Sequence, residues 1–201
     1  FHTMHHDRLD SPGYKEKFRD EIKKFAELTN HKSRGFRAPT FSLNNNSSWA
    51  IDILAENDYM YDSSVVPAKT SMYGLPGAQE SPYKISSKNI EQHNSDGIVT
   101  EFPLLVTKFM GKKIPAGGGF YLRTLPTKII KNAIKNYQKQ EIPATFYIHS
   151  WELTPEYMPK IQLPVKENFV TYHNIGKAYT RMNKLLQQFQ FTSFSNFISE
   201  G

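Results

Sequence analysis

Two histidines near the start of the sequence, His2 and His6, have the spacing of metal ligands. A separation of four positions places both imidazoles on one face of a helical turn or on one side of a strand. Two imidazoles in this arrangement can hold a zinc-like ion, and a carboxylate commonly supplies the third ligand. A histidine-rich end also occurs as a tag remnant, and a single pair is a weak signal. The pair therefore predicts a metal site only in combination with other residues.

Three polar residues, Arg37, Asp62 and His149, each follow a short run with the composition of a strand. Because the carboxyl ends of parallel strands face the active site in α/β folds, we expect these side chains to meet at one rim. His149 is a candidate general acid or base. Asp62 is a candidate partner for a base, and Arg37 a candidate cation that fixes a catalytic carboxylate. Their ordinary alternatives are a core histidine, a turn-forming aspartate and a surface arginine.

The composition excludes several classes of protein. The 201 residues contain 25 Lys+Arg against 19 Asp+Glu, a formal net charge of +6, and no cysteine. Disulfide scaffolds, thiolate zinc sites and cysteine nucleophiles are thereby excluded. The lysines are spread along the chain without the aromatic residues of a nucleic-acid module, so we expect no nucleic-acid partner. No apolar run approaches the roughly 18 residues of a membrane span, so we expect no transmembrane segment.

Strand and helix candidates alternate along most of the chain. Apolar spacing predicts helices over residues 12–30, 49–54, 126–137 and 175–189, the first capped by Ser11, and strands over residues 35–37, 59–61, 98–105, 144–148 and 191–192. This alternation predicts an α/β fold of one domain, residues 1–201, with parallel strands covered by helices. Residues 65–125 read as a loop-rich elaboration, and residues 170–201 as a C-terminal helical extension. The run Gly117-Gly118-Gly119 lacks the residues of a phosphate loop and predicts a tight backbone path.

Three strings occur in an order that is typical of one enzyme family. They are His2-Thr3-Met4-His5-His6, Arg37-Ala38-Pro39-Thr40-Phe41 and Tyr147-Ile148-His149. They resemble the His-Ser/Thr-x-x-His, Arg-x-Pro and apolar-x-His motifs of the polysaccharide deacetylases, the carbohydrate esterase family with the NodB-homology domain. The chain is similar to one subgroup, associated with exopolysaccharide biosynthesis and carrying a C-terminal extension, in the strings Gly35-Phe36-Arg37-Ala38-Pro39, Tyr61-Asp62-Ser63-Ser64, Gly117-Gly118-Gly119-Phe120-Tyr121 and His149-Ser150-Trp151-Glu152.

The resemblance implies a fold and a reaction. The fold is a distorted (β/α) barrel. The reaction is metal-dependent hydrolysis of N-acetyl, occasionally O-acetyl, groups on an acetylated polysaccharide or oligosaccharide. The cofactor it implies is a divalent metal ion, with zinc expected, bound by His2 and His6.

The resemblance also implies roles for residues around the metal. His149 protonates the leaving amine, Arg37 orients a catalytic aspartate, and Asp62 tunes His149. The backbone N–H of Thr40 is the implied oxyanion donor. The implied apolar walls are Phe41, Ile148 and Trp151.

The paired acidic residues of the family, a catalytic base and a metal ligand, precede its histidine motif and have no counterpart ahead of Phe1. We therefore expect the barrel to lack its first strands here and the third metal ligand, an Asp, to belong upstream of Phe1. We also expect this 201-residue form to bind metal weakly and to have little activity.

Two other functions stay open at this stage. One is a cyclic imide or ureide hydrolase of the same superfamily, and the other is a catalytically impaired, carbohydrate-binding remnant. The sequence leaves the oligomeric state and the localisation undetermined. It favours the cytoplasm or a membrane-associated biosynthetic complex over an extracytoplasmic location.

Overall fold

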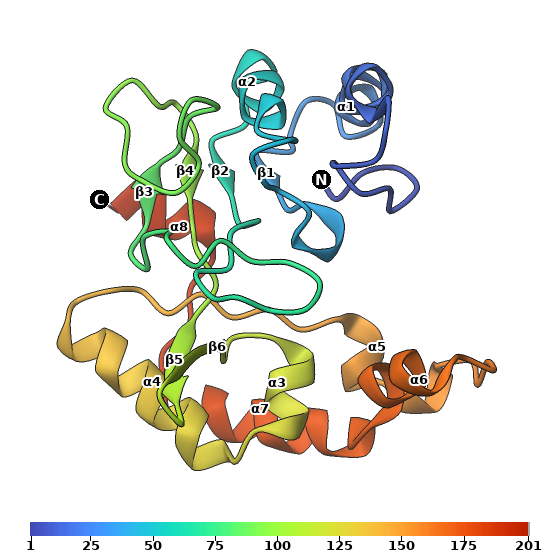
Figure 1. Cartoon of the computed structure of the whole chain (residues 1–201), viewed down its shortest axis with the longest axis vertical. Helices are drawn as coiled ribbons and strands as arrows, with labels where there is room; N and C mark the ends of the chain where they lie inside the picture. The colour runs from blue at the N-terminus through green and yellow to red at the C-terminus, as the bar shows by residue number, and fades with distance from the viewer. Residues whose placement is uncertain (201) are drawn as a thin grey trace.

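A small mixed sheet forms the centre of the upper layer of the molecule (Figure 1). In this computed structural model, which describes residues 1–200, the strands β1 (Gly35–Phe36), β2 (Tyr61–Asp62) and β4 (Thr100–Glu101) are parallel neighbours. Strand β3 (Tyr83–Lys84) pairs antiparallel with β4, so the order is β1-β2-β4-β3. The parallel pairing of β1, β2 and β4 is the pairing expected from the sequence.

Parallel neighbours continue on both sides of these strands. The ammonium group of Phe1 donates to the carbonyl of Gly35 over 2.7 Å, and the N–H of Arg37 donates to the carbonyl of Phe1 over 3.1 Å. Further along the chain from β4, Leu104 forms a parallel bridge with Thr145. The expected strand over residues 144–148 is thus reduced to one bridge within an extended segment.

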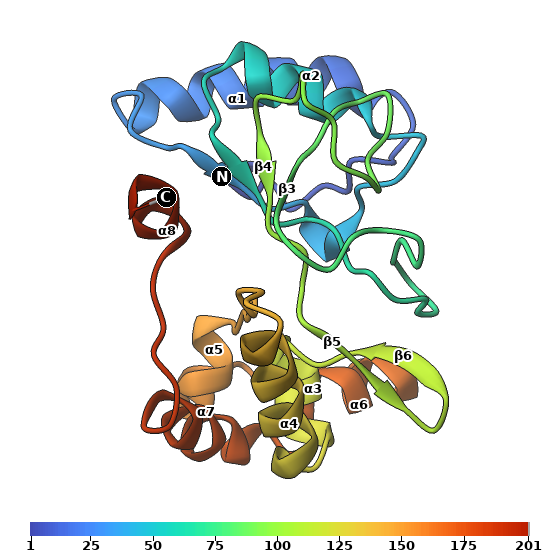
Figure 2. The same cartoon turned by 90° about the vertical axis from the view of Figure 1, so that its left-hand side faces the viewer.

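Two helices cover one face of the sheet, α1 (Tyr14–Leu28) and α2 (Trp49–Glu56) (Figure 2). Phe18 and Ile22 of α1 are fully buried, as their spacing of four positions on an apolar face requires. The expected cap at Ser11 is wrong, because α1 begins at Tyr14. The carbonyl of Ser11 instead accepts the N–H of Tyr14 over 3.2 Å, in a turn that the left-handed φ of Gly13 closes.

A second layer lies below the sheet and is mostly helical (Figure 2). It contains the hairpin β5 (Val106–Phe109) and β6 (Lys112–Pro115) and the helices α3 (Gly119–Thr124), α4 (Thr127–Lys139), α5 (Ser150–Leu153), α6 (Val165–Tyr172) and α7 (Ala178–Leu186). Helix α4 follows its predicted apolar spacing, and Ile130, Ala133, Ile134 and Tyr137 are buried. Within residues 1–200, no helix has both the length and the apolar content needed to cross a membrane.

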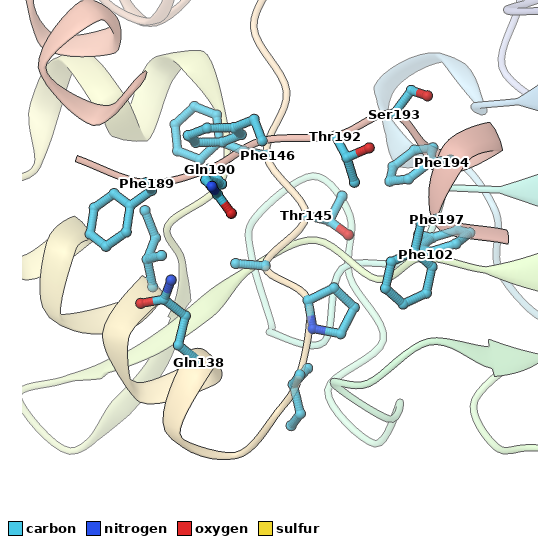
Figure 3. Close-up of a pocket in the computed structure, with 15 residues that line it drawn as sticks. Phe102, Gln138, Thr145, Phe146, Phe189, Gln190, Thr192, Ser193, Phe194 and Phe197 are labelled. Carbon is cyan, nitrogen blue, oxygen red and sulfur yellow. The ribbon is translucent and has the colours of Figure 1, made fainter. Parts of the chain in front are cut away.

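The end of the chain returns from the lower layer to the sheet. After α7 an extended segment leads to α8 (Phe194–Glu200), which lies beside the sheet in Figure 2. The predicted strand at Phe191-Thr192 is wrong, because this extended stretch joins no strand ladder among the described residues. Phe194 stacks on buried Phe102 with ring centroids 4.3 Å apart. Figure 3 shows the apolar cavity of about 190 Å³ that this crossing leaves beside Thr145 and Phe146.

Candidate functional site

The largest cavity lies between the two layers and measures about 540 Å³. It brings together eight of the nine candidate residues predicted from the sequence, namely His2, His6, Arg37, Thr40, Phe41, Ile148, His149 and Trp151. The lower layer completes the lining with residues from α3, the extended segment before α5, and α6. The ninth candidate, Asp62, is not part of the lining.

The two N-terminal histidines face one another in this cavity. Their ring centroids are 5.0 Å apart and the rings meet at 69°. Nδ1 of His2 lies 2.6 Å from the carbonyl oxygen of Arg37, so Nδ1 carries the ring proton and Nε2 is left free as a ligand. Partial desolvation lowers the pKa of His2 more than this hydrogen bond raises it, which favours the neutral, metal-binding form.

A buried carboxylate on α1 holds the loop that carries these histidines. Glu21 accepts the backbone N–H of Met4 over 3.0 Å and the hydroxyl of Tyr14 over 2.7 Å. The loop needs such support because Thr3 and His6 both adopt positive φ, at 54° and 60°. The sequence reasoning missed Glu21, although a glutamate among the apolar positions of an amphipathic helix was the available signal.

His2 and His6 fit part of a zinc site. A catalytic zinc ion has three protein ligands and an open position for water. Within residues 1–200, no group of three or more His, Cys, Asp or Glu side chains is arranged to hold one ion. The two imidazoles therefore account for two ligands, and a complete site needs at least one more donor.

Arg37 lies behind these histidines. Its Nε donates to the carbonyl of Ser63 over 2.8 Å, and one terminal nitrogen donates to the Ser63 hydroxyl over 2.8 Å. The guanidinium also lies over the rings of Phe41 and Tyr147, 5.9 and 5.2 Å from their centroids. In the described part of the chain no carboxylate forms a salt bridge with Arg37, so its charge is available to an acidic group in the cavity.

Thr40 and Phe41 lie on a tight turn. The sequence indicated the motif that contains them but not this turn. The turn is η1 (Pro39–Phe41), and Thr40 and Phe41 have positive φ angles of 51° and 50°. The Thr40 hydroxyl accepts a hydrogen bond from Arg8 over 2.7 Å and donates to the carbonyl of Pro39. Since the first N–H groups of a helical turn have no acceptor within it, the N–H of Thr40 is available as a donor at the cavity wall.

Asp62 lies in the sheet beside Glu101 and is fully buried. Its Oδ1 accepts the Ser64 hydroxyl over 2.5 Å, while its Oδ2 has no hydrogen-bond partner among residues 1–200. Glu101 accepts the backbone N–H of Val65 over 3.0 Å. Burial raises the pKa of Asp62 to about 6, and burial together with the adjacent Asp62 raises the pKa of Glu101 well above its ordinary value. The expected contact of Asp62 with His149 is not formed, because Asp62 is buried in the sheet beside Glu101.

We predict that Asp62→Asn removes part of the pH dependence of stability. A carboxyl whose pKa is raised on folding stabilises the fold below its unfolded pKa, and this contribution is lost as the pH rises through about 6. Asparagine keeps an acceptor for Ser64 and never ionises. Relative to the wild type, the variant should therefore gain on the order of 1–3 kcal/mol in unfolding free energy between pH ~4.5 and ~7.5.

Urea unfolding at both pH values measures this difference. The matched control is Asp52→Asn, because Asp52 is an exposed carboxylate on α2. A stability difference between Asp62→Asn and the wild type that stays constant with pH would show that the buried carboxyls do not titrate as described.

The carboxylate beside His149 is Glu152 and not the expected Asp62. Its Nδ1 lies 3.0 Å from Oε2 of Glu152, and its backbone N–H donates to the same oxygen over 3.1 Å. Oε1 of Glu152 accepts Nε of Arg123 over 2.7 Å. Burial would raise the pKa of Glu152, yet the hydrogen bonds from His149 and Arg123 outweigh it and hold this pKa below its ordinary value. Glu152 is therefore an ionised partner for the imidazole.

The run Gly117-Gly118-Gly119, which leads into α3, leaves room for the segment that carries His149. A Cβ on Gly119 would lie 1.8 Å from Oε2 of Glu152, and a Cβ on Gly118 would lie 2.6 Å from the ring of Tyr147. Both distances are shorter than real contacts, so only glycine fits at these positions without displacement of the neighbours. The prediction of a tight backbone path is confirmed, and the structure shows that the side chains of Tyr147 and Glu152 are the groups that approach the glycines.

Glu152 and Arg123 are two further residues of the candidate site that the sequence did not predict. Glu152 was visible as part of the His149-Ser150-Trp151-Glu152 string, three positions after the histidine. Arg123 carried no local signal, because its partners lie 29 to 50 residues away.

The comparisons with known proteins identify a family without a named activity. Neither a curated protein nor a solved structure matches the chain. Residues 63–199 match the family model described as "Domain of unknown function (DUF3473)". This segment includes His149, Glu152 and Arg123, whereas the histidine pair and Arg37 precede it. Since the match spans more than half of the sequence, the chain belongs to the DUF3473 family.

Proposed function

We propose that this protein is a metal-dependent hydrolase that removes N-acetyl, or O-acetyl, groups from an acetylated polysaccharide or oligosaccharide. The observation that carries the proposal is the convergence of His2, His6, Arg37 and His149 on one cavity. The family resemblance of the motifs that contain these residues gives the chemistry, and their arrangement around a single space is consistent with it.

The reaction needs a nucleophile, an oxyanion donor and an acid. Water adds to the acetyl carbonyl carbon, the C–N bond breaks, and the nitrogen leaves as an amine after taking up a proton. His2 and His6 would hold a divalent metal ion, which would act as a Lewis acid on the carbonyl and lower the pKa of a bound water. The N–H of Thr40 stabilises the oxyanion, and His149 donates the proton to the leaving nitrogen.

Two roles need carboxylates that the cavity does not offer in free form. They are the remaining metal ligand and the base that takes the proton of the attacking water. Of the described residues that line the cavity, Glu152 alone is acidic, and it is bound to Arg123 and His149. Arg37, which has no carboxylate partner here, would hold the base ionised and oriented.

The walls of the cavity suit an acetylated sugar. Phe41, Ile148 and Trp151 supply apolar surface, and a few polar groups converge between them, as in most small-molecule sites. Aromatic rings pack well against the apolar face of a sugar ring, and the apolar side chains can enclose an acetyl methyl group.

We further propose that the sheet belongs to a distorted (β/α) barrel. Phe1, β1, β2, the β4 strand with its continuation to Leu104, and Thr145 are successive parallel neighbours in chain order. Parallel neighbours that follow one another in chain order are a feature of (β/α) barrels, and this order supports the proposal. Helices lie in the connections here except between β2 and β4, where β3 lies instead.

Acetate release from N-acetylglucosamine oligomers tests the function. We expect a protein that contains this sequence and also supplies the two carboxylates to release acetate in the presence of Zn²⁺ and to stop on addition of a chelator, whereas the 201 residues alone should release little. Cyclic imides and ureides should not be opened. Ring opening without acetate release would replace the proposal by the imide hydrolase alternative. Oligosaccharide binding without hydrolysis would replace it by a carbohydrate-binding function.

A further inference from the structure

A single buried guanidinium connects the His149 network to the wall of the cavity. The side chains of Arg123 and Glu152 are each 1 % exposed, and they form a salt bridge of 2.7 Å. The two terminal nitrogens of Arg123 donate to the carbonyls of His173 and Val170, over 2.5 and 2.9 Å. These carbonyls belong to the C-terminal end of α6, where a cation is favourable for the helix dipole. Helix α6 also contributes Lys166 and Val170 to the cavity lining.

The same network leaves the His149 ring little freedom. Glu152 occupies Nδ1, so Nε2 is the ring nitrogen left for a molecule in the cavity. Trp151 stacks on the imidazole with centroids 5.0 Å apart and an angle of 19°, and Tyr147 meets the ring edge-on at 5.4 Å. The side chain of His149 is nevertheless 46 % exposed, which leaves it accessible to substrate.

The carboxylate of Glu152 is confined from the opposite side as well. Gly119 approaches it so closely that one methyl group there would occupy the position of Oε2. With Arg123 on one oxygen and His149 on the other, the carboxylate has no second place to move to without breaking a buried charge pair.

We infer that Glu152 and Arg123 are positioning residues that hold the proton of neutral His149 on Nδ1 and present Nε2 to the cavity. Arg123 joins α6 to the same network, so the cavity wall and the orientation of the imidazole depend on one side chain. The consequence for catalysis rests on the proposed function, whereas the effect on the tautomer of His149 does not.

The test uses three variants with one matched control. In Glu152→Gln the amide oxygen can accept from Arg123 or from His149 but not from both. In Gly119→Ala the new methyl group displaces the carboxylate, and in Arg123→Lys one ammonium cannot reach three acceptors. The control is Gly176→Ala, because a Cβ on Gly176 meets nothing within 4 Å. Thermal unfolding identifies the variants that remain folded.

Histidine ¹⁵N spectra at about pH 8, where an ordinary imidazole is neutral, report the tautomer directly. We expect the Nδ1–H tautomer of His149 in the wild type and in Gly176→Ala, and its loss in every folded variant of the network. We also expect kcat for acetate release to fall by about 10- to 100-fold with KM changed less than about twofold.

An unchanged tautomer in folded Glu152→Gln and Gly119→Ala would overturn the inference. A changed tautomer with unchanged kcat would equally overturn the positioning role. Absence of acetate release by the wild type, with the Nδ1–H tautomer in place, would instead count against the proposed function, so the two failures can be told apart.

Discussion

Replacing His149 by glutamine should lower kcat for acetate release by about 10²- to 10⁴-fold, the usual contribution of a general acid. Glutamine has similar reach and can still accept or donate hydrogen bonds, but it cannot deliver a proton to the leaving nitrogen. Because His149 is partly exposed at the cavity and is not a predicted metal ligand, metal binding should be unaffected. Steady-state kinetics on N-acetylglucosamine oligomers and isothermal titration with Zn²⁺ measure the two quantities separately.

The matched control for this variant is His31→Gln. His31 is exposed and lies in the turn after α1, outside the cavity lining. An O-acetyl substrate with a good leaving group provides a second test of the acid role. Its leaving group needs less protonation, so His149→Gln should lose less activity on this substrate than on an N-acetyl substrate. Equal losses on both kinds of substrate, or a loss of Zn²⁺ affinity, would contradict the assignment of His149 as the acid.

The parts of the fold that were predictable are those with a local signal. Helix α4 shows its apolar spacing plainly, and β1, β2 and β4 contain strand-forming residues ahead of polar ones. Helix α8 lies within the expected C-terminal helical extension, but its bounds were not predicted, because the contact that it makes, Phe194 on Phe102, joins residues far apart in sequence. The start of α1 was misplaced because Ser11-Pro12 is a good helix start in isolation, whereas the left-handed Gly13 delays it.

The residues of the candidate site likewise fall into those with a local sequence signal and those without one. His2, His6, Arg37 and His149 could be predicted because each stands in a short string with recognisable spacing. The carboxylate partner of His149 could not be predicted, since Asp62 and Glu152 are both buried and only the fold decides which of them lies beside the imidazole. Asp62 was predicted as the partner because it follows a strand-like segment, yet in the structure it lies in the sheet beside Glu101. The imidazole of His149 contacts Glu152 instead.

Two regions of the chain contribute residues to the lining of the cavity. The matched segment, residues 63–199, contains His149, Glu152, Arg123 and the α6 residues of the cavity wall. The residues before it carry the two imidazoles and the Arg37 turn. Residues from both regions are therefore needed to line this cavity.

Replacing either His2 or His6 by alanine should lower the affinity for Zn²⁺ by at least about 100-fold, more than the loss of an outer partner of a metal ligand usually costs. Each substitution removes one of the two imidazoles that the described residues bring together. Wild-type affinity should also fall as the pH is lowered, because the imidazoles must be neutral to bind. Zinc titration by calorimetry at pH ~7.5 and ~5.5 measures both effects.

The control for these variants is His5→Ala, which removes a histidine from the same loop without touching the cavity. His5 is exposed and does not belong to the lining, whereas the residues on either side of it in the motif, His2 and His6, do. If all three substitutions weakened Zn²⁺ binding equally, the ion would be held by a flexible histidine cluster. Selective loss in His2→Ala and His6→Ala is expected, because these two rings face one another in the cavity, and a backbone carbonyl holds Nδ1 of His2 so that its Nε2 would be free to bind the ion.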